Sequence, residues 1–500
     1  MKSGINNPLV IYFLLFVTCV LILLQSPIAP FAGGIPDIDS SVFIYSGKSI
    51  LSGKLIYRDI FDHKGPFLYV IQVAGLKLFK GNLSGIWILE LFSLMATSLI
   101  LYRTIRLLYS SSVSLFSTFF ALVYIVDKLK GGNLSEEWAL PYISIAIYLF
   151  VYYFLRGKKL SVIQLLILSL SFLLVFFLRP NMVAVWIGIG VILIYDLIKN
   201  NRIKDLLKYI LIIFLSIILG FLPFVIYGYN KNILHDAFVS IFQFNSSSYM
   251  LQHTMPVIRG FFYEIMALKY LPFIAVIYVI YIILSYKEHF NFIIHIGVSL
   301  SIILTAFACS IGNGYEHYYI IYLPLLVFPY AFIINYLTIN LKRNQYWFIS
   351  MLFIILFYPT FQTIKGRIRE RYVLYKNEGI KLKNNLNQIF ESERIDKNDK
   401  ILVVGNSCFY YLCSERFSSS SYPYIYPIIN SKGDIIIKYL SELKQYPPKL
   451  IITDRFYNEN MINSIVKEKI QNYIENNYTQ LNTSIVVKWY GEARIWVLKK

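Results

Sequence analysis

Residues 37–66 combine four aspartates, one histidine and four basic residues between two long apolar segments. Charged side chains beside a membrane span are costly unless they bind something or take part in a reaction. An aspartate in such a loop could act as a general base, and a lysine could bind an anion such as phosphate. The segment therefore predicts acid–base chemistry at the water side of a membrane.

Two aspartates, Asp37 and Asp39, follow the first apolar run as an Asp-x-Asp pair. Asp39 precedes a segment that is typical of a short helix closed by Gly53, so we expect Asp39 to be the catalytic base and Asp37 to be the second candidate. Alternatively, Asp39 only caps this helix, which is a common role for aspartate. Asp37 could also help to bind Mg²⁺ or Mn²⁺, because these ions prefer oxygen ligands.

The motif Asp-His-Lys-Gly-Pro ends this loop, and its Gly65-Pro66 step predicts the start of a helix over 66–80 that lies along the membrane interface. The free N–H groups at a helix start attract anions. His63 and Lys64 are therefore candidate ligands of a phosphate, although Lys64 could instead be an interfacial charge that reaches water. The loop also supplies three candidate substrate-binding residues, Arg58, Asp59 and Asp62.

Two sites later in the chain are further candidates. Arg179 lies between two apolar runs, where it must find a counter-anion or reach water, so it is either a phosphate clamp or a loop-end cation. His317 lies at the end of a predicted span and could donate a hydrogen bond to phosphate or sugar, with Tyr318 beside it as a substrate-binding residue. A histidine satisfied within an aromatic belt is the alternative for His317.

The elements that must position these residues are membrane helices. The chain of 500 residues is 57% hydrophobic and 15% charged, with a mean hydropathy of +0.57, which predicts a polytopic membrane protein. Its net charge of +19 comes mostly from short basic clusters between apolar runs. Such clusters are orientation signals, so a nucleic-acid partner is not expected.

The apolar runs predict about eleven transmembrane helices. They lie near 8–28, 85–108, 112–127, 136–155, 161–178, 181–198, 206–228, 262–285, 291–310, 317–339 and 346–362. With a cytoplasmic N-terminus, most basic clusters fall on inside loops, as the positive-inside rule requires. The first outside loop is the exception and keeps four cations, Lys48, Lys54, Arg58 and Lys64.

The predicted organisation has two parts. Residues 1–362 form a transmembrane domain with a first outer loop, 29–84, that carries interfacial helices. An odd number of spans places residues 363–500 outside the cell. Short apolar strands there alternate with helical segments at 373–390 and 460–476, so a small α/β domain is expected. The predicted strands are Ile401–Val404, Leu450–Thr453 and Ser484–Val487. Cys408 and Cys413 in this tail are expected to be buried thiols, because their spacing on a helix does not suit a disulfide.

The first outer loop carries a resemblance to a known family. An acidic residue after the first span, a short helix, an Asp and then Asp-His-Lys-Gly-Pro opening an interfacial helix resemble the bacterial GT-C membrane glycosyltransferases related to protein O-mannosyltransferase and lipid A aminoarabinose transferase. The resemblance covers about residues 37–75, with weaker matches at 178–181, 315–324 and in the tail. It implies a polyprenyl-phosphate sugar donor, an outward-facing site, inversion at the sugar carbon and an acidic base, Asp39 or Asp37. The lysine of the family's Lys-Pro element corresponds to Lys64, but here a glycine separates it from the proline.

The predicted function is transfer of a hexosyl or pentosyl group from polyprenyl phosphate to an extracytoplasmic glycan, lipid or protein, by a multi-pass protein of the plasma membrane that also contacts membrane lipid. No cofactor is certain. One alternative is a transporter or flippase of lipid-linked saccharides, which would favour broken helices repeated in two halves; the sequence shows no such repeat. A polymerase or ligase is the other alternative, and it would place basic residues in a large later loop. The loop 229–261 is poor in arginine.

Overall fold

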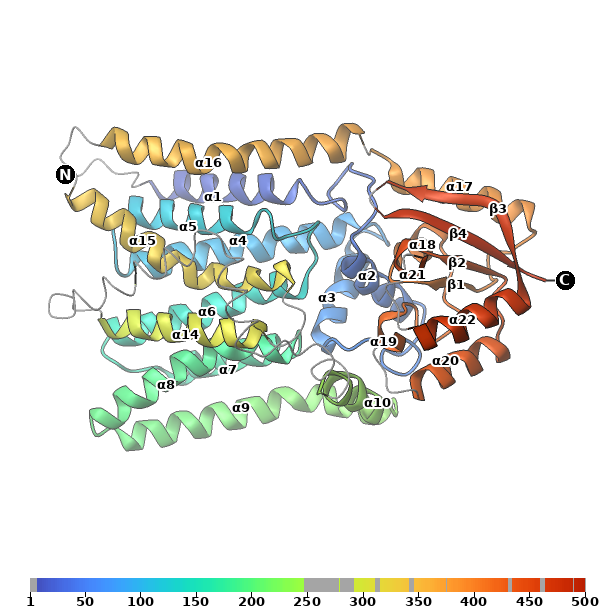
Figure 1. The fold of residues 1–500 in the computed structure, drawn as a ribbon. Coiled ribbons are helices and arrows are strands. Elements are labelled where there is room, and N and C mark those ends of the chain that lie inside the picture. The colour runs from blue at the N-terminus through green and yellow to red at the C-terminus, as the bar shows by residue number, and fades with distance from the viewer. Residues whose placement is uncertain are drawn as a thin grey trace. The chain divides into compact units, whose positions relative to one another are not determined.

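The structure is a computed structural model in which the chain forms two compact units, each described by itself below (Figure 1). The described residues are 7–246, 278, 292–310, 315–340, 346–374, 376–429, 434–458, 464–488 and 490–499. The helical unit contains Met1–Gln25, Ile88–Tyr227 and His253–Ile368. The mixed unit contains Ser26–Trp87, Gly228–Gln252 and Arg369–Lys500.

The helical unit is built from long apolar helices. They are α1 (Pro8–Leu23), α4 (Ser84–Arg106), α5 (Ser111–Ile125), α6 (Ser135–Leu155), α7 (Val162–Phe176), η1 (Pro180–Val183), α8 (Ala184–Lys199), α9 (Ile203–Asn230), α14 (Phe292–Ser310), η4 (Glu316–Tyr322), α15 (Leu323–Asn340) and α16 (Tyr346–Arg369). Six helical stretches in the described part of the chain are long and apolar enough to cross a membrane. This agrees with a multi-pass membrane protein.

The predicted apolar runs coincide with these helices, except for 262–285, of which only Tyr278 belongs to the described residues. The total of eleven spans therefore stays a prediction. The helices pack in pairs, α8 on α14, α5 on α15 and α6 on α7. At the first of these contacts a Cβ on Gly188 would lie 2.4 Å from the Ser301 hydroxyl oxygen. Only glycine permits this close approach, as is common between membrane helices.

The mixed unit combines the first outer loop with the tail of the chain. Its elements are α2 (Ile38–Leu51), α3 (Pro66–Leu78), α10 (Leu234–Phe238), η2 (Val239–Gln243), η6 (Glu370–Leu374), α17 (Glu378–Ser392), β1 (Ile401–Val404), α18 (Phe409–Ser414), α19 (Tyr426–Ile429), α20 (Asp434–Gln445), β2 (Leu450–Thr453), α21 (Arg455–Asn458), α22 (Ser464–Asn477), β3 (Tyr478–Val487) and β4 (Gly491–Leu498). The sheet has the order β1-β2-β4-β3. β1 and β2 are parallel, and β4 is antiparallel to both of its neighbours.

The core of the mixed unit draws on distant parts of the sequence. Leu402 and Ile451 from the strands pack with Tyr439 and with Phe61 of the first outer loop. Phe244, which follows η2, joins the same cluster and contacts Phe61 edge-on at 5.2 Å between ring centres. The first outer loop is thus part of the hydrophobic core of this unit, rather than a loose connection between spans. The division into domains 1–362 and 363–500 stays a prediction.

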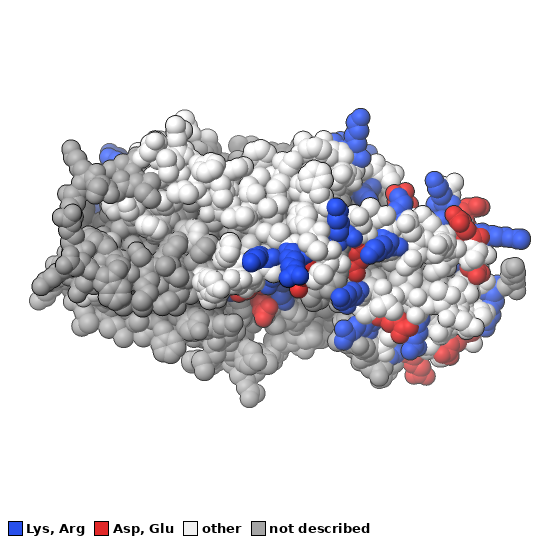
Figure 2. All heavy atoms as spheres, turned by 90° about the horizontal axis from the view of Figure 1, so that it is seen from above, with Lys and Arg blue, Asp and Glu red and all other residues white. Residues whose placement is uncertain are grey.

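Charged residues are unevenly distributed between the two kinds of structure. Figure 2 shows a face on which lysine, arginine, aspartate and glutamate gather over the C-terminal elements, whereas the described atoms of the long helices are almost all uncharged. α9 is an example of a long helix with few charges. In its most apolar stretch of 18 residues the mean hydropathy is 2.8, and only 6% of that stretch is buried. Such a helix is suited to lipid rather than to water.

Candidate functional site

The start of α2 presents two carboxylates in different positions. Asp37 is the N-cap residue of α2, and Asp39 lies in its first turn. The alternative in which Asp39 only caps this helix is therefore wrong, because the helix begins one residue before it, at Ile38. The Tyr490 hydroxyl donates a hydrogen bond to Asp37 Oδ1 at 3.3 Å. Asp39 is exposed, at a helix N-terminus whose partial positive charge favours a negative group.

Asp62 is the centre of a buried polar cluster in the same unit. Its side chain is 1% exposed. The Tyr424 hydroxyl donates to Asp62 Oδ1 at 3.1 Å, and the backbone N–H of His63 donates to the same oxygen at 2.6 Å. His63 Nδ1 lies 3.4 Å from Asp62 Oδ1. The Tyr424 hydroxyl oxygen also lies 3.4 Å from His63 Nδ1.

The second oxygen of Asp62 has a different environment. Asp62 Oδ2 is buried and makes no hydrogen bond of good geometry with the described residues, and the same is true of the nearby Tyr69 hydroxyl. Burial raises the pKa of the Asp62 carboxyl, while the charge of Lys64 and the hydroxyls of Tyr69 and Tyr424 oppose the rise. A buried carboxylate with one unused oxygen is available to bind a ligand hydroxyl.

The Tyr424 hydroxyl lies in the electrostatic field of two carboxylates. Burial raises the pKa of the Tyr424 hydroxyl well above its usual value, and the charges of Asp62 and, more weakly, Asp39 raise it further. Whether the candidate base Asp39 and the buried Asp62 act in one site stays a prediction. The tail segment that carries Tyr424 is held on the first outer loop, since Phe61 N–H donates to the Ser421 carbonyl at 2.7 Å.

A second set of contacts fixes the tail segment from its other side. The carboxylate of Glu442, on α20, accepts hydrogen bonds from the hydroxyls of Ser420 and Ser421, both at 2.7 Å, and from the Ser421 N–H at 2.8 Å. Ser418 N–H also donates to the Tyr45 hydroxyl of α2 at 2.9 Å. The serine-rich run is therefore a rigid support for Tyr424.

Lys64 lies two residues before Pro66, the predicted first residue of the helix. α3 begins at Pro66 with proline in the first position, which confirms the prediction from Gly65-Pro66. The Tyr57 hydroxyl donates to the Lys64 carbonyl at 2.9 Å, so the backbone is fixed while the lysine side chain is half-buried. On α3, the apolar side chains Val70 and Leu78 are 60% and 55% exposed, and the position of this helix along the membrane interface stays a prediction.

The remaining candidates of the first outer loop pair with each other. The Arg58 guanidinium lies 3.0 Å from Asp59 Oδ1, and the Leu55 N–H donates to Asp59 Oδ2 at 2.8 Å. The half-exposed Arg58 side chain leaves this pair at the surface. Their predicted role in substrate binding stays a prediction.

In the helical unit, Arg179 is not a loop-end cation that reaches water. Its side chain is 11% exposed and forms an ion pair of 2.6 Å with Glu136, which is 2% exposed. The guanidinium also lies over the Tyr318 ring, 4.0 Å from its centre. Glu136 in turn accepts a hydrogen bond from Ser135 at 2.9 Å. A phosphate at Arg179 would therefore meet a cation already oriented by an acid and an aromatic ring.

His317 lies beside this group. It belongs to η4, a 3₁₀ segment before α15, and is 9% exposed. Its ring stacks on Tyr315 at 5.5 Å and meets Tyr318 edge-on at 4.7 Å. The surroundings are those of the aromatic-belt alternative, and they also join His317 to Arg179 through Tyr318. A role in phosphate binding stays a prediction for both residues.

Sequence reasoning missed several members of these clusters. Glu136 and Glu137 occupy the acidic first turn of α6, and both are buried, which their place at the start of an apolar run did not indicate. Glu90 is also buried, and its carboxylate accepts a hydrogen bond from the Asn133 N–H. The available signal was an acidic pair at the start of one apolar run and a lone arginine at the end of another. Tyr424 and Tyr69 carried no comparable signal in a chain with 42 tyrosines.

The metal site considered for Asp37 can be tested against the structure. No group of three or more histidine, cysteine, aspartate or glutamate side chains that could hold a metal ion occurs among the described residues. Asp37 instead has Tyr490 as a neighbour. Binding of Mg²⁺ or Mn²⁺ by Asp37 stays a prediction. Cys408 and Cys413 are free thiols, as expected.

Comparison with known proteins identifies the fold. No family model and no curated protein sequence matches the chain. Among solved structures, ArnT from Cupriavidus metallidurans bound to undecaprenyl phosphate aligns over 98% of both chains with 9% identity and a TM-score of 0.59. The archaeal oligosaccharyltransferase AglB from Archaeoglobus fulgidus, in complex with an inhibitory peptide and a dolichol-phosphate, aligns over 97% of this chain and 74% of its own, with 10% identity and a TM-score of 0.50. The A. fulgidus enzyme in complex with Zn and sulfate aligns over 96% and 72%, with 11% identity and a TM-score of 0.51.

Both proteins are GT-C membrane glycosyltransferases, and the alignments extend over nearly the whole of this chain. The resemblance seen in the first outer loop is thus confirmed at the level of the fold. Identities of 9–11% show a common fold and leave the donor, the acceptor and the catalytic residue to be argued from this chain's own residues.

Proposed function

We propose that the protein is a glycosyltransferase that moves a hexosyl or pentosyl group from a polyprenyl-phosphate donor to an acceptor outside the cytoplasm, with Asp39 as the base. The observation that supports this most directly is that one unit carries two carboxylates in different surroundings: Asp39 is exposed in the first turn of α2, and Asp62 is buried and hydrogen-bonded by Tyr424. The neighbours ArnT and AglB, solved with undecaprenyl phosphate and a dolichol-phosphate, support a lipid-linked donor.

The reaction needs one proton transfer and one displacement. Asp39 accepts the proton of an acceptor hydroxyl as its oxygen attacks the anomeric carbon from the face opposite the phosphate. The bond between that carbon and the phosphate oxygen breaks, and the electron pair leaves with the phosphate. The product therefore has the inverted configuration, and no covalent enzyme intermediate is required.

The other residues of the cluster have supporting roles. Lys64, beside the N-terminus of α3, stabilises the charge that develops on the departing phosphate. Asp62 Oδ2 accepts a hydrogen bond from a sugar or acceptor hydroxyl. Tyr424 and His63 hold Asp62 in place through its other oxygen. This division of roles uses only residues of the mixed unit.

The proposed topology follows from the same chemistry. The N-terminus is cytoplasmic and the tail that bears Tyr424 is extracytoplasmic, so that the site opens on the side where exported acceptors occur. Labelling of single cysteines at position 39 and at the N-terminus of intact cells, with a reagent that does not cross the membrane, tests this. Labelling of position 39 from outside is expected, and protection there would contradict the proposal.

The activity is tested with the purified full chain in lipid vesicles and a panel of radiolabelled polyprenyl-phosphate hexoses and pentoses. Cell-envelope fractions serve as acceptors. Transfer of label out of the lipid fraction is expected, and it should be lost in Asp39→Asn. Asp205→Asn, which removes a carboxylate from the first turn of α9, is the matched control and should keep transfer. Movement of label across the vesicle membrane without transfer would instead support a flippase.

A further inference from the structure

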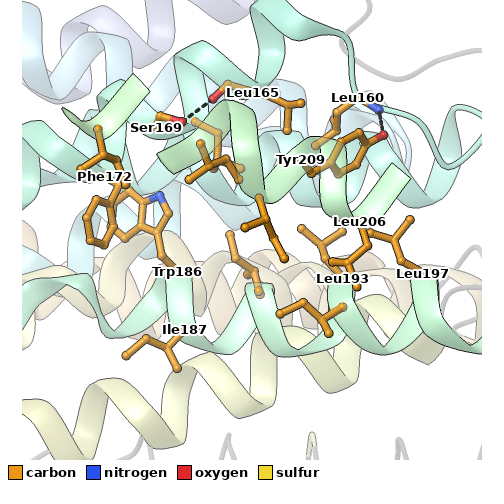
Figure 3. A pocket seen from close by; sticks show the side chains of 17 residues that line it. Leu160, Leu165, Ser169, Phe172, Trp186, Ile187, Leu193, Leu197, Leu206 and Tyr209 are labelled. Carbon is orange, nitrogen blue, oxygen red and sulfur yellow. Dashed lines mark hydrogen bonds between the residues drawn. The ribbon is translucent and has the colours of Figure 1, made fainter. Parts of the chain in front are cut away.

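A hollow lies in the helical unit between α7, α8 and α9, and it is open on one part of its wall, where Ile187, Ile194 and Ile210 are about half exposed. Its volume is about 290 Å³. Figure 3 shows leucine and isoleucine side chains from these helices pointing into it, with Trp186 and Phe172 at one end and Tyr209 at the other. The residues of α8 that line it extend from Trp186 to Leu197, a length of about 16 Å at the usual rise of a helix.

The hollow is apolar in chemistry as well as in composition. Ser169 donates its hydroxyl to the Leu165 carbonyl at 2.8 Å, and the Tyr209 hydroxyl accepts the Leu160 N–H at 2.8 Å. Trp186 Nε1 makes no hydrogen bond with the described residues. A water molecule needs two or more polar partners, which this lining does not offer. An elongated, dry space in a membrane unit fits a hydrocarbon chain.

Gly190 has no side chain and borders empty space in the hollow. Gly190 lines it, and a Cβ at this position would have no atom within 4 Å. A larger side chain here would therefore enter the hollow without displacing the backbone. The position offers a way to fill the space and leave the rest of the unit unchanged.

The end of the hollow at Leu160 and Leu197 is strongly basic. Exposed cations on the adjoining chain segments are Arg156, Lys159, Lys199, Lys204 and Lys208. The two acids of this region are already paired, Asp196 with Lys158 and Asp205 with Arg202, both at 2.7 Å. The excess positive charge at one end of an apolar hollow matches a lipid with a negative headgroup.

We propose that the hollow binds one acyl chain of an anionic phospholipid, with the headgroup against this basic rim. The site differs from that of the donor. Arg179, the predicted donor-phosphate ligand of the same unit, follows the C-terminal end of α7, whereas the basic rim adjoins its N-terminal end. A lipid whose phosphate meets Arg179 would have its headgroup at the opposite end of the helix.

Lipid retention by the purified full chain tests the proposal. The chain is reconstituted in vesicles that contain equal amounts of dioleoylphosphatidylglycerol and dioleoylphosphatidylcholine. It is then extracted with detergent, and the lipid that stays bound is identified by native mass spectrometry. One retained phosphatidylglycerol per chain is expected. Gly190→Leu should lower its retention more than about tenfold, because the acyl chain loses its buried contacts. Gly366→Leu, at another open glycine of the unit, should retain the lipid as the unaltered chain does.

The basic rim is tested by Lys159→Gln, Lys204→Gln and Lys208→Gln together. The preference for phosphatidylglycerol over phosphatidylcholine should fall by about fivefold for each lysine. These exposed changes leave the packing intact, so they decide the matter even if Gly190→Leu does not fold. Unchanged retention in a folded Gly190→Leu, unchanged preference in the lysine variant, or retention of polyprenyl phosphate or phosphatidylcholine instead would overturn the proposal.

Discussion

The two units differ in the partners that stabilise their buried charged side chains. In the helical unit, Arg179 and Glu136 are both buried and form a 2.6 Å ion pair. In the mixed unit the buried carboxylate, Asp62, has no arginine or lysine within ion-pair distance among the described residues, and it is held by a tyrosine hydroxyl, a backbone N–H and a histidine. The exposed carboxylate of the same unit, Asp39, lies in the first turn of α2.

The difference follows from what each group must do. A cation in an apolar unit is stable only with a counter-charge, so Glu136 fixes Arg179 in one place. Asp62 is proposed to accept a hydrogen bond from a ligand hydroxyl, and a lysine or arginine in direct contact would occupy the oxygen that this needs. Hydroxyls and imidazoles can hold a carboxylate without a full charge. The mixed unit therefore leaves an acceptor oxygen of Asp62 without a close cation, whereas the helical unit holds Arg179 in a buried ion pair.

The largest effect on activity is expected for Asp39→Asn in the mixed unit. If Asp39 is the base, turnover should fall by about 10²–10⁴-fold while the fold is unchanged. Initial rates of label transfer, with circular dichroism as the check on folding, measure this. Turnover equal to that of the unaltered chain, with Asp37→Asn also active, would remove both candidate bases.

Glu136→Gln should be the most destabilising change in the helical unit. It leaves the buried Arg179 charge without its partner, which costs about 3–5 kcal/mol of the free energy of unfolding. Thermal unfolding in detergent measures the loss. Glu136→Leu combined with Arg179→Met removes both charges and should recover most of the stability. If the double variant is no more stable than the single one, charge pairing is not the reason for the arrangement.

Tyr424→Phe should have an intermediate effect. It removes the hydroxyl donor to the buried Asp62 carboxylate, at a cost of about 1–3 kcal/mol. Tyr490→Phe is the matched control, since it removes a 3.3 Å hydrogen bond to the half-buried Asp37. Unfolding of both variants by denaturant gives the comparison. Equal losses would show that burial of Asp62 does not matter.

The pH dependence of stability should report on Asp62. Its pKa is raised by burial, so between the unfolded value of about 3.9 and the folded value the folded chain binds more protons than the unfolded chain. Stability from this group is thus present below about 3.9 and is lost as the pH rises through the folded pKa. Asp62→Asn, which cannot titrate, should gain stability relative to the unaltered chain as the pH rises. A difference in melting temperature that is constant with pH would contradict this.

The smallest effect is expected at the surface pair of Lys383 and Glu415. Its length, 2.6 Å, equals that of the Arg179–Glu136 pair, but the two side chains are 42% and 65% exposed. Solvent screening limits such a pair to about 0–1 kcal/mol, so Glu415→Gln should barely change the melting temperature. A loss as large as that of Glu136→Gln would mean that distance rather than burial decides the strength of these pairs.

Local patterns predicted the elements well. Apolar run length located the long helices, Gly65-Pro66 located the start of α3, and short apolar segments located β1 and β2. β4 was missed because charged residues such as Glu492 and Arg494 interrupt its apolar pattern; its opening position, Gly491, would disrupt a strand interior. Its central position in the sheet depends on pairing with both β2 and β3.

The sequence by itself determined the class of the protein, the places of the described long apolar helices and the loop in which to look for chemistry, because hydropathy and turn residues act over a few positions. The tertiary structure alone decided the partners. Glu136 meets Arg179 across 43 positions, and Tyr424 meets Asp62 across 362. Such contacts depend on how helices and strands pack, and burial then sets the strength of each charge, which no local pattern records.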